Sequence, residues 1–220
     1  MEMGDEPKNG EDDAVGESRG LARTPTYLTT LTEKFHWYSN STLIYTILTI
    51  IHLPFLLHSL QYPRQIMDAV KRFFSSPRFA VAGASNDPAK FGFKILAWYH
   101  QHSLPVTPLN PRAPQINLPS RAYDTVPSPS KLPSPTQTSL SVVTPPPVTL
   151  QVLQEAHSVG IPAVWLQPGT FDDAVLEYAH GHFEAVIAGD GGAGGEGWCV
   201  LVDGDEGLDA AGVQWTSQRL

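Results

Sequence analysis

The sequence predicts an α/β fold in which a mainly parallel sheet of five strands has helices on both faces. From about Met67 onward, short apolar runs of strand length alternate with longer segments whose apolar residues recur at helical spacing. The hydrophobic share of 41% over 220 residues is large enough to form a core. Strands that alternate with helices form βαβ units with right-handed crossovers, so we expect a doubly wound, Rossmann-like arrangement.

Five apolar runs have the length and composition of buried strands. They are Arg78–Gly83, Leu104–Leu109, Ser139–Val143, Ala163–Leu166 and Ala185–Ala188. Four helices are predicted before and between them, around residues 66–74 and over Phe91–His102, Val148–Val159 and Phe171–His180. Because the strands are parallel, the loops after them meet at one edge of the sheet, where such folds bind ligands.

The limits of the helices follow from spacing and from end signals. One face of the helix after the first strand is apolar and consists of Phe91, Ile95, Trp98 and Tyr99. Gly160 follows the next helix at the position of a C-cap, and Thr170 precedes the last helix as its expected N-cap.

Three stretches of the predicted domain are irregular. Residues 111–137 are rich in Pro and Ser, so we expect a long loop that includes a short strand near Arg121–Tyr123. The glycine-rich segment Gly189–Gly197 is expected to be a flexible connector. A further short strand is expected at Trp198–Val202.

The N-terminal part differs from the rest of the chain. Residues 1–41 are polar and acidic, without periodicity, and are expected to be disordered. Thr42–Leu60 has 19 residues without a formal charge, close to the length that spans a bilayer, but Pro54 would interrupt a helix there. A membrane anchor, a poorly packed hydrophobic helix and an extension that the mature protein lacks are all open interpretations. We therefore divide the chain into an extension, 1–66, and a domain, 67–220.

The charge distribution favours a small phosphorylated ligand over nucleic acid. The chain has 14 basic and 22 acidic residues, which give a net charge of -8. Between Leu60 and Lys131, nine basic residues accompany only three acidic ones. This local excess suits a ligand with several phosphates, although it is also typical of ordinary solvated surface. The single cysteine, Cys199, excludes an intramolecular disulfide and fits a reducing, cytoplasmic location.

The loop after the first strand has the features of an anion site. From Gly83 it reads GASNDPAKFG, between a predicted strand and a predicted helix. Gly83 permits a tight turn, and unpaired N–H groups of Gly83, Ala84 and Ser85 would face the charged end of a nucleotide. Lys90 and Lys94 follow closely enough to meet a phosphate.

Two differences separate this pattern from the dinucleotide fingerprint GxGxxG. Ser85 replaces the second glycine, and the spacing from there to Gly92 is wider. The second strand is followed by Asn110, Pro111 and Arg112 instead of the acidic residue that holds the ribose of NAD. Asn110 can hydrogen-bond an adenosine, and Arg112 suits a phosphate. The loop therefore disfavours NAD, is compatible with a 3′-phosphorylated ribose and leaves NADP open.

Five motifs lie in order near the predicted strand ends. They are GAS from Gly83, KFGFK from Lys90, PLNP from Pro108, TPP from Thr144 and WLQPG from Trp165. Together they resemble the CoA-binding domain family, in particular its small stand-alone bacterial and fungal members, which are similar to the nucleotide-binding domain of the alpha subunit of succinyl-CoA synthetase. The resemblance covers about Phe73 to Cys199 and implies a Rossmann-like fold with coenzyme A across the carboxyl edge of the sheet.

The resemblance implies that the first motif meets phosphates, that Lys94 faces the ligand, and that Asn110 and Pro111 border the adenosine. It also implies that Pro146 and Gln167 line the far side. With the two further cations, the predicted ligand-binding residues are Gly83, Ala84, Ser85, Lys90, Lys94, Asn110, Pro111, Arg112, Pro146 and Gln167. The chain departs from the family in its longer, proline-rich loop after Arg112 and in its glycine-rich insertion, and it lacks the phosphorylated histidine segment of the synthetase.

No catalytic or metal-binding set stands out in the sequence. Cys199 has no His partner at a recognisable spacing, and His180 and His182 lack further ligands for a metal. We expect a cytoplasmic, non-catalytic binder of coenzyme A or acyl-CoA. The alternative is an NADP-dependent oxidoreductase, although no Tyr–Lys pair lies at a suitable spacing. A membrane-tethered scaffold is a third interpretation, which depends on Thr42–Leu60.

Overall fold

The structure, a computed structural model, describes residues 64–189, 192, 194–195 and 197–220. The predictions for residues 1–41 and Thr42–Leu60 lie outside these ranges, as do four positions of Gly189–Gly197. Within the described ranges, no helix is both long enough and apolar enough to cross a membrane.

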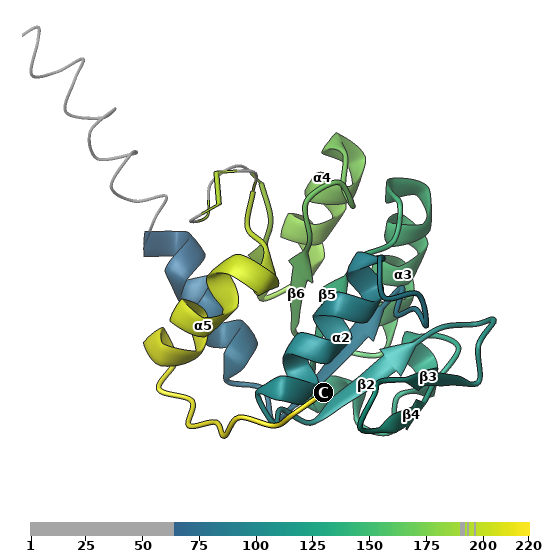
Figure 1. The fold of residues 1–220 in the computed structure, drawn as a ribbon. Coiled ribbons are helices and arrows are strands. Elements are labelled where there is room, and N and C mark those ends of the chain that lie inside the picture. The colour runs from purple at the N-terminus through teal and green to yellow at the C-terminus, as the bar shows by residue number, and fades with distance from the viewer. Residues whose placement is uncertain (1–63, 190–191, 193, 196) are drawn as a thin grey trace, which may run out of the picture. The chain divides into compact units, whose positions relative to one another are not determined.

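The predicted parallel sheet is present, with its five strands in the order β2-β1-β5-β6-β7 (Figure 1). The strands are β1 (Arg78–Ala82), β2 (Val106–Leu109), β5 (Thr138–Val142), β6 (Ala163–Leu166) and β7 (Ala185–Ile187). All neighbouring strands of this sheet are parallel, which confirms the doubly wound α/β class. The chain runs from β1 out to β2 and then back across β1 to β5. The order therefore reverses between β1 and β5, where folds of this class bind ligands.

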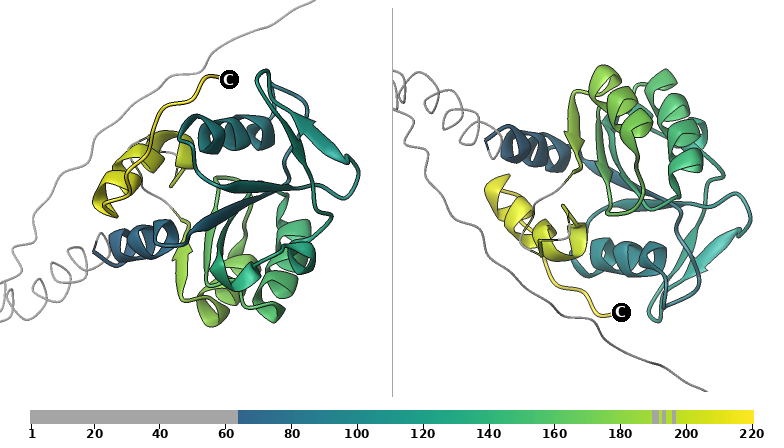
Figure 2. Two further views of the ribbon diagram at one scale, coloured as in Figure 1. Left: turned by 90° about the horizontal axis from the view of Figure 1, so that it is seen from below. Right: turned by 90° about the horizontal axis from the view of Figure 1, so that it is seen from above.

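Helices cover both faces of the sheet (Figure 2). One face has the helical residues 64–74, α2 (Phe91–Gln101) and α5 (Val200–Ala210), and the other has α3 (Pro146–Ser158) and α4 (Asp173–His182). Residues of β1 alternate between the two cores, with Phe79 and Val81 in the first and Ala80 and Ala82 in the second. Burial on both faces explains why the strands read as continuous apolar runs.

Helix α5 stands where the sequence predicted a strand at Trp198–Val202, so that prediction was wrong. This helix contains two glycines and three aspartates, which have low helix propensity, so the sequence does not predict a helix here. In the fold, a Cβ atom at Gly204 would lie 2.5 Å from the ring of Trp98, and one at Gly207 would lie 2.7 Å from the ring of Phe74. The two glycines therefore let α5 pack closely on α2 and on the first helix, and tertiary packing stabilises it.

Helix α4 begins two residues later than predicted, at Asp173. Its N-cap is Asp172 and not Thr170, because the Asp172 carboxylate accepts a hydrogen bond from the N–H of Val175 at 3.0 Å. The Thr170 hydroxyl donates to the carbonyl oxygen of Gln167 at 2.7 Å and closes the loop after β6.

The region predicted as a long loop contains an antiparallel pair, β3 (Gln115–Asn117) and β4 (Ala122–Asp124), and two 3₁₀ turns, Pro129–Lys131 and Pro135–Gln137. Strand β4 corresponds to the predicted strand, whereas β3 was not predicted. The side chain of Asn86, in the loop after β1, donates to the Gln115 carbonyl at 2.8 Å and accepts from the Asn117 N–H at 2.7 Å. These bonds hold the hairpin against the loop that forms the predicted anion site.

Tyr99 is expected to contribute to a loss of stability at alkaline pH. Its side chain is fully buried, and its hydroxyl lies 2.8 Å from Oγ of Ser141 on β5. Burial raises the pKa of the phenol, against the opposing effect of the Ser141 hydrogen bond. Because the unfolded phenol ionises near pH ~10 while the buried one stays neutral, stability is retained below that pH and lost above it, by about 1.4 kcal/mol per pH unit.

We expect Tyr99→Phe to flatten this alkaline loss of stability, measured as the free energy of unfolding in urea between pH 8 and pH 11. A loss as steep in the variant as in the unaltered protein would contradict the assignment to Tyr99.

Candidate ligand-binding site

A cavity of about 660 Å³ lies at the carboxyl edge of the sheet, where the strand order reverses. We name it the charged cavity, because two basic side chains and one acidic side chain line it. Its wall consists of residues 82–85, 109–112, 127–129 and 143–145, with Lys90, Val148, Gln151, Val152 and Glu155. The cavity thus joins the loops after β1, β2 and β5 to the first turns of α3.

Gly83 makes the turn that leads from β1 toward α2. Its φ of 89° lies in the left-handed region, and an added Cβ atom would lie 3.0 and 3.1 Å from the side chains of the two residues that follow β5. The Gly83 N–H donates to the carbonyl oxygen of Leu109 at 3.2 Å, so it is not unpaired as predicted. Within the described part of the chain, the N–H groups of Ala84 and Ser85 have no acceptor. These two amides remain for an anion.

Gly92 lies in the first turn of α2, directly against the end of β1. A Cβ atom at this position would overlap the carbonyl oxygen of Gly83 and would lie 3.2 Å from Cα of Ala84. Glycine here lets the start of the helix approach the strand, which is the role of the third glycine in the dinucleotide fingerprint. The wider spacing of this loop places Lys90 at the N-cap position of α2.

Asn110 connects the loops after β1 and β2. Its Nδ2 donates to the carbonyl oxygen of Ala84 at 2.8 Å, and its Oδ1 accepts from the N–H groups of Arg112 and Ala113 at 2.7 and 3.0 Å. The predicted contact of Asn110 with an adenosine is therefore restricted to the second hydrogen of Nδ2. The main effect of this side chain is to fix the shape of the wall.

The two basic side chains of the charged cavity have no described partner, whereas its acidic side chain is hydrogen-bonded. The side chains of Lys90 and Arg112 are exposed, and neither forms an ion pair or hydrogen bond with another described residue. Glu155 is half-buried and accepts hydrogen bonds from the Ser128 hydroxyl and from the Ser130 N–H. Burial alone would raise the pKa of Glu155, but these hydrogen bonds outweigh it and the pKa is lowered. Glu155 is therefore ionised at neutral pH, so this cavity has one negative and two positive side chains.

Two of the predicted residues lie outside the cavity walls. Lys94 is exposed on α2, with its Nζ 5.3 Å from the centre of the Phe91 ring. Pro146 is the first residue of α3, because proline fits the first turn of a helix, and this helix starts earlier than the predicted Val148. Pro145, one residue earlier, lines the wall instead.

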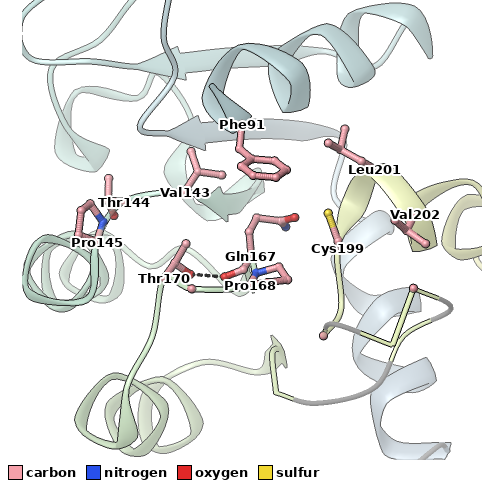
Figure 3. A pocket seen from close by; sticks show the side chains of 13 residues that line it. Phe91, Val143, Thr144, Pro145, Gln167, Pro168, Thr170, Cys199, Leu201 and Val202 are labelled. Atoms are coloured by element: carbon pink, nitrogen blue, oxygen red, sulfur yellow. Dashed lines mark hydrogen bonds between the residues drawn. The ribbon is translucent and has the colours of Figure 1, made fainter. Parts of the chain in front are cut away.

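A second cavity, of about 500 Å³, lies between the start of α2 and the start of α5 (Figure 3). Its wall consists of residues 143–145, 167–170, 194, 197, 199 and 201–202, with Phe91. We name it the uncharged cavity, because none of these side chains carries a formal charge. The two cavities share residues 143–145, which follow β5.

Gln167 lines the uncharged cavity from the end of β6, on the far side from β1. Its side chain is only 3% exposed, and its Oε1 accepts from the Val200 N–H at 3.0 Å. Its Nε2 has no acceptor among the described residues. In Figure 3 the amide extends between Phe91 and Cys199. A buried donor without a partner is rare in folded proteins and points to a missing acceptor.

Cys199 is the N-cap residue of α5, and its N–H donates to the Asp203 carboxylate at 2.8 Å. Burial raises the pKa of the thiol, and the Asp203 charge adds to this effect, against weaker hydrogen bonds from the Leu201 and Val202 N–H groups. The thiol therefore stays protonated at neutral pH and contributes a small, weakly polar surface to the wall.

Of the residues that line this cavity, the sequence had placed only Gln167 at the site, and the large apolar residues Phe91, Leu201 and Val202 are among those that it missed. Phe91 was assigned to the same apolar face of α2 as Ile95, Trp98 and Tyr99, but it is 61% exposed and lines the cavity. Leu201 and Val202 were assigned to a strand, and they reach the cavity because α5 starts just before them. An apolar residue in the first turn of a helix can indicate a binding surface. This indication could not be used here, because the start of α5 was not predicted.

Comparison with solved structures finds proteins that are similar to part of this chain. A conserved hypothetical protein from Pyrococcus furiosus is 28% identical, with a TM-score of 0.47, over 57% of this chain and 97% of its own. A hypothetical protein from Pyrococcus horikoshii OT3 is 19% identical, with a TM-score of 0.48, over 54% and 80%. A protein from Thermus thermophilus is 24% identical, with a TM-score of 0.45, over 52% and 83%. No curated protein matches the chain.

The family comparison covers the part of the chain that forms both cavities up to the glycine-rich segment. Residues 77–191, more than half of the 220 residues, match the model of the CoA binding domain. The protein therefore belongs to the CoA-binding domain family.

Proposed function

We propose that the protein is a non-catalytic binder of coenzyme A, free or as an acyl-CoA, and that the nucleotide lies in the charged cavity. The observation that supports this most directly is the pair of unpartnered cations, Lys90 and Arg112, in one wall with the free amides of Ala84 and Ser85. Lys90 and the amides lie at the start of α2, which suits a diphosphate. Arg112 follows β2, where the ribose lies in folds of this class, and suits its 3′-phosphate.

NADP is the competing ligand, because it also has a phosphorylated ribose. The adjoining cavity favours coenzyme A over NADP. Beyond its diphosphate, coenzyme A continues as an uncharged pantetheine arm, which would pass residues 143–145 and enter a cavity whose described wall residues carry no formal charge. NADP would place a second nucleoside with a cationic or bulky ring there, and no carboxylate is among the described residues of this wall.

The wall residues support binding without catalysis. Among the described residues, no histidine lines either cavity. Glu155 has a lowered pKa and is therefore a weak proton donor, and Cys199 has a raised pKa and is therefore a weak nucleophile.

Calorimetry on the full chain tests this proposal. At one fixed salt concentration, we expect coenzyme A to bind about tenfold more tightly than 3′-dephospho-CoA, a difference of about 1.4 kcal/mol, which is within the range of one charge-assisted contact. NADP should bind more weakly than coenzyme A, and NAD most weakly. Preferential binding of NAD, or no binding of coenzyme A, would overturn the proposal.

Arg112→Ala should remove the tenfold preference for the 3′-phosphate and leave the affinity for 3′-dephospho-CoA unchanged. Lys94→Ala is the matched control, since it removes one exposed positive charge outside both cavities. If both variants lost affinity equally, a general effect of surface charge would replace the specific contact.

A further inference from the structure

The uncharged cavity gathers apolar surface that the fold leaves open to solvent. Phe91 is 61% exposed and Val202 is 51% exposed, and both line this cavity together with Leu201. Most large apolar side chains of the described domain are buried in its two cores, so two exposed ones in a single wall form an unusual concentration. Exposed apolar surface that is gathered in a concave site is typical of a ligand-binding surface.

The same wall contains a hydrogen-bond donor with a fixed orientation, the side-chain amide of Gln167. The Oε1 atom of Gln167 is bound by the Val200 N–H at 3.0 Å, which fixes the orientation of the amide and leaves Nε2 without an acceptor. Nε2 is almost inaccessible to water, so solvent does not satisfy it. The exposed ring of Phe91 lies beside the amide (Figure 3), so a ligand can reach Nε2 only if this side chain rotates and opens the way to it. A carbonyl oxygen that enters at this point would accept the hydrogen bond.

The pantetheine arm carries amide carbonyls in every form of coenzyme A, so the difference between the forms lies beyond the sulfur, where an acyl thioester adds both a carbonyl acceptor and an apolar chain and a free thiol adds neither. The terminal thiol of coenzyme A is a weak donor and a weak acceptor, and it brings no chain to cover Phe91 and Val202. An acyl thioester brings a carbonyl oxygen and, directly behind it, an aliphatic chain. We propose that the uncharged cavity holds the acyl group of an acyl-CoA, with the thioester carbonyl at Nε2 of Gln167 and the aliphatic chain on Phe91, Leu201 and Val202. This inference rests on the proposed function and selects the acylated form of the ligand.

The acyl group remains on coenzyme A in this arrangement. Transfer of the acyl group to Cys199 would form a thioester at the Cys199 sulfur and release coenzyme A as its free thiol. This transfer would require the thiolate form of Cys199. Burial and the Asp203 charge keep the thiol protonated. The cavity therefore recognises the acyl group without cleaving it.

Calorimetry on the full chain with free CoA, butyryl-CoA and octanoyl-CoA tests the inference. We expect affinity to rise with chain length, by about threefold to fourfold for each methylene that the cavity buries. Equal affinity for free CoA and octanoyl-CoA, or a preference for free CoA, would overturn the inference and leave the proposed function intact. Absence of binding for all three would instead overturn the proposed function.

Two substitutions locate the acyl group. Val202→Ser should reduce the gain from butyryl-CoA to octanoyl-CoA and leave the affinity for free CoA unchanged. Val148→Ser is its matched control, because Val148 is 45% exposed but lines the charged cavity. If the two variants reduced the gain equally, or if neither reduced it, the acyl chain would not lie in the uncharged cavity.

Gln167→Glu tests the carbonyl contact. Glutamate keeps an oxygen for the Val200 N–H but replaces the donor Nε2 with a second oxygen. We expect the preference for butyryl-CoA over free CoA to be lost in this variant, while the melting temperature shows that the fold is kept. A preference retained at full size would overturn the role of Gln167. If the variant does not fold, the Val202 and Val148 pair decides the inference.

Discussion

Gly92→Ala is expected to destabilise the fold by about 3 kcal/mol or more, at or above the upper end of the usual effect of overpacking. The added methyl group would occupy the position of the Gly83 carbonyl oxygen and would approach the Cα atom of Ala84. Both are backbone atoms, so no side-chain rotation relieves the overlap. Either α2 moves away from β1 or the turn after β1 changes its shape. Since about 1 kcal/mol shifts the melting temperature by about 2–4 °C in a chain of this size, a decrease of roughly 6–12 °C is expected.

Gly181→Ala is the matched control for this experiment. Gly181 also lies in a helix, α4, but nothing lies within 4 Å of the position of its Cβ atom. Alanine should therefore leave stability unchanged or raise it by about 0.5–1 kcal/mol, because glycine lowers helix stability. Equal melting temperatures for the two variants would show that α2 does not approach the strand closely. Any Gly92→Ala protein that folds should also bind coenzyme A more weakly, because its amides at Ala84 and Ser85 are displaced.

The positions of the strands could be predicted because burial on both faces leaves a simple pattern. Strand β6, for example, is apolar throughout and was predicted with its observed limits. The parallel arrangement places the loops after the strands at one edge, so the residues at the ends of β1, β2 and β6 were expected at one site. Gly83, Arg112 and Gln167 do line the two adjoining cavities.

The rest depends on tertiary contacts that local patterns do not contain. Helix α5 is stabilised by the close approach of Gly204 to Trp98, and a sequence shows only that glycine disfavours a helix. Likewise, the bonds from Asn86 to β3 and from Asn110 to the loop after β1 join segments far apart in the chain. Phe91 has the spacing of a core residue, but it lies at the first position of α2 and escapes burial.

Trp165→Ala is expected to destabilise the protein by about 3–5 kcal/mol, as for other large aromatic residues removed from a core. Its side chain is fully buried on β6, and its ring makes edge-on contacts with Phe73 and Phe74 at centroid distances of 5.5 and 5.8 Å. Alanine would leave a cavity between the sheet and the first helix. Urea unfolding should show this loss as a lower midpoint with an unchanged dependence on urea concentration.

Trp165→Phe separates the packing of this residue from its hydrogen bond. The indole Nε1 donates to the carbonyl oxygen of Trp198 at 3.0 Å, directly before Cys199 and the start of α5. Phenylalanine keeps most of the ring but frees that carbonyl, so a cost of about 1–3 kcal/mol is expected. Because Trp198 precedes the wall residues of α5, the same variant should lose part of its preference for octanoyl-CoA over free CoA while its affinity for free CoA is kept. A Trp165→Phe variant that is destabilised but keeps its full preference for octanoyl-CoA would show that the bond to Trp198 stabilises only the core. The positions of Leu201 and Val202 would then depend on the packing of α5 on α2.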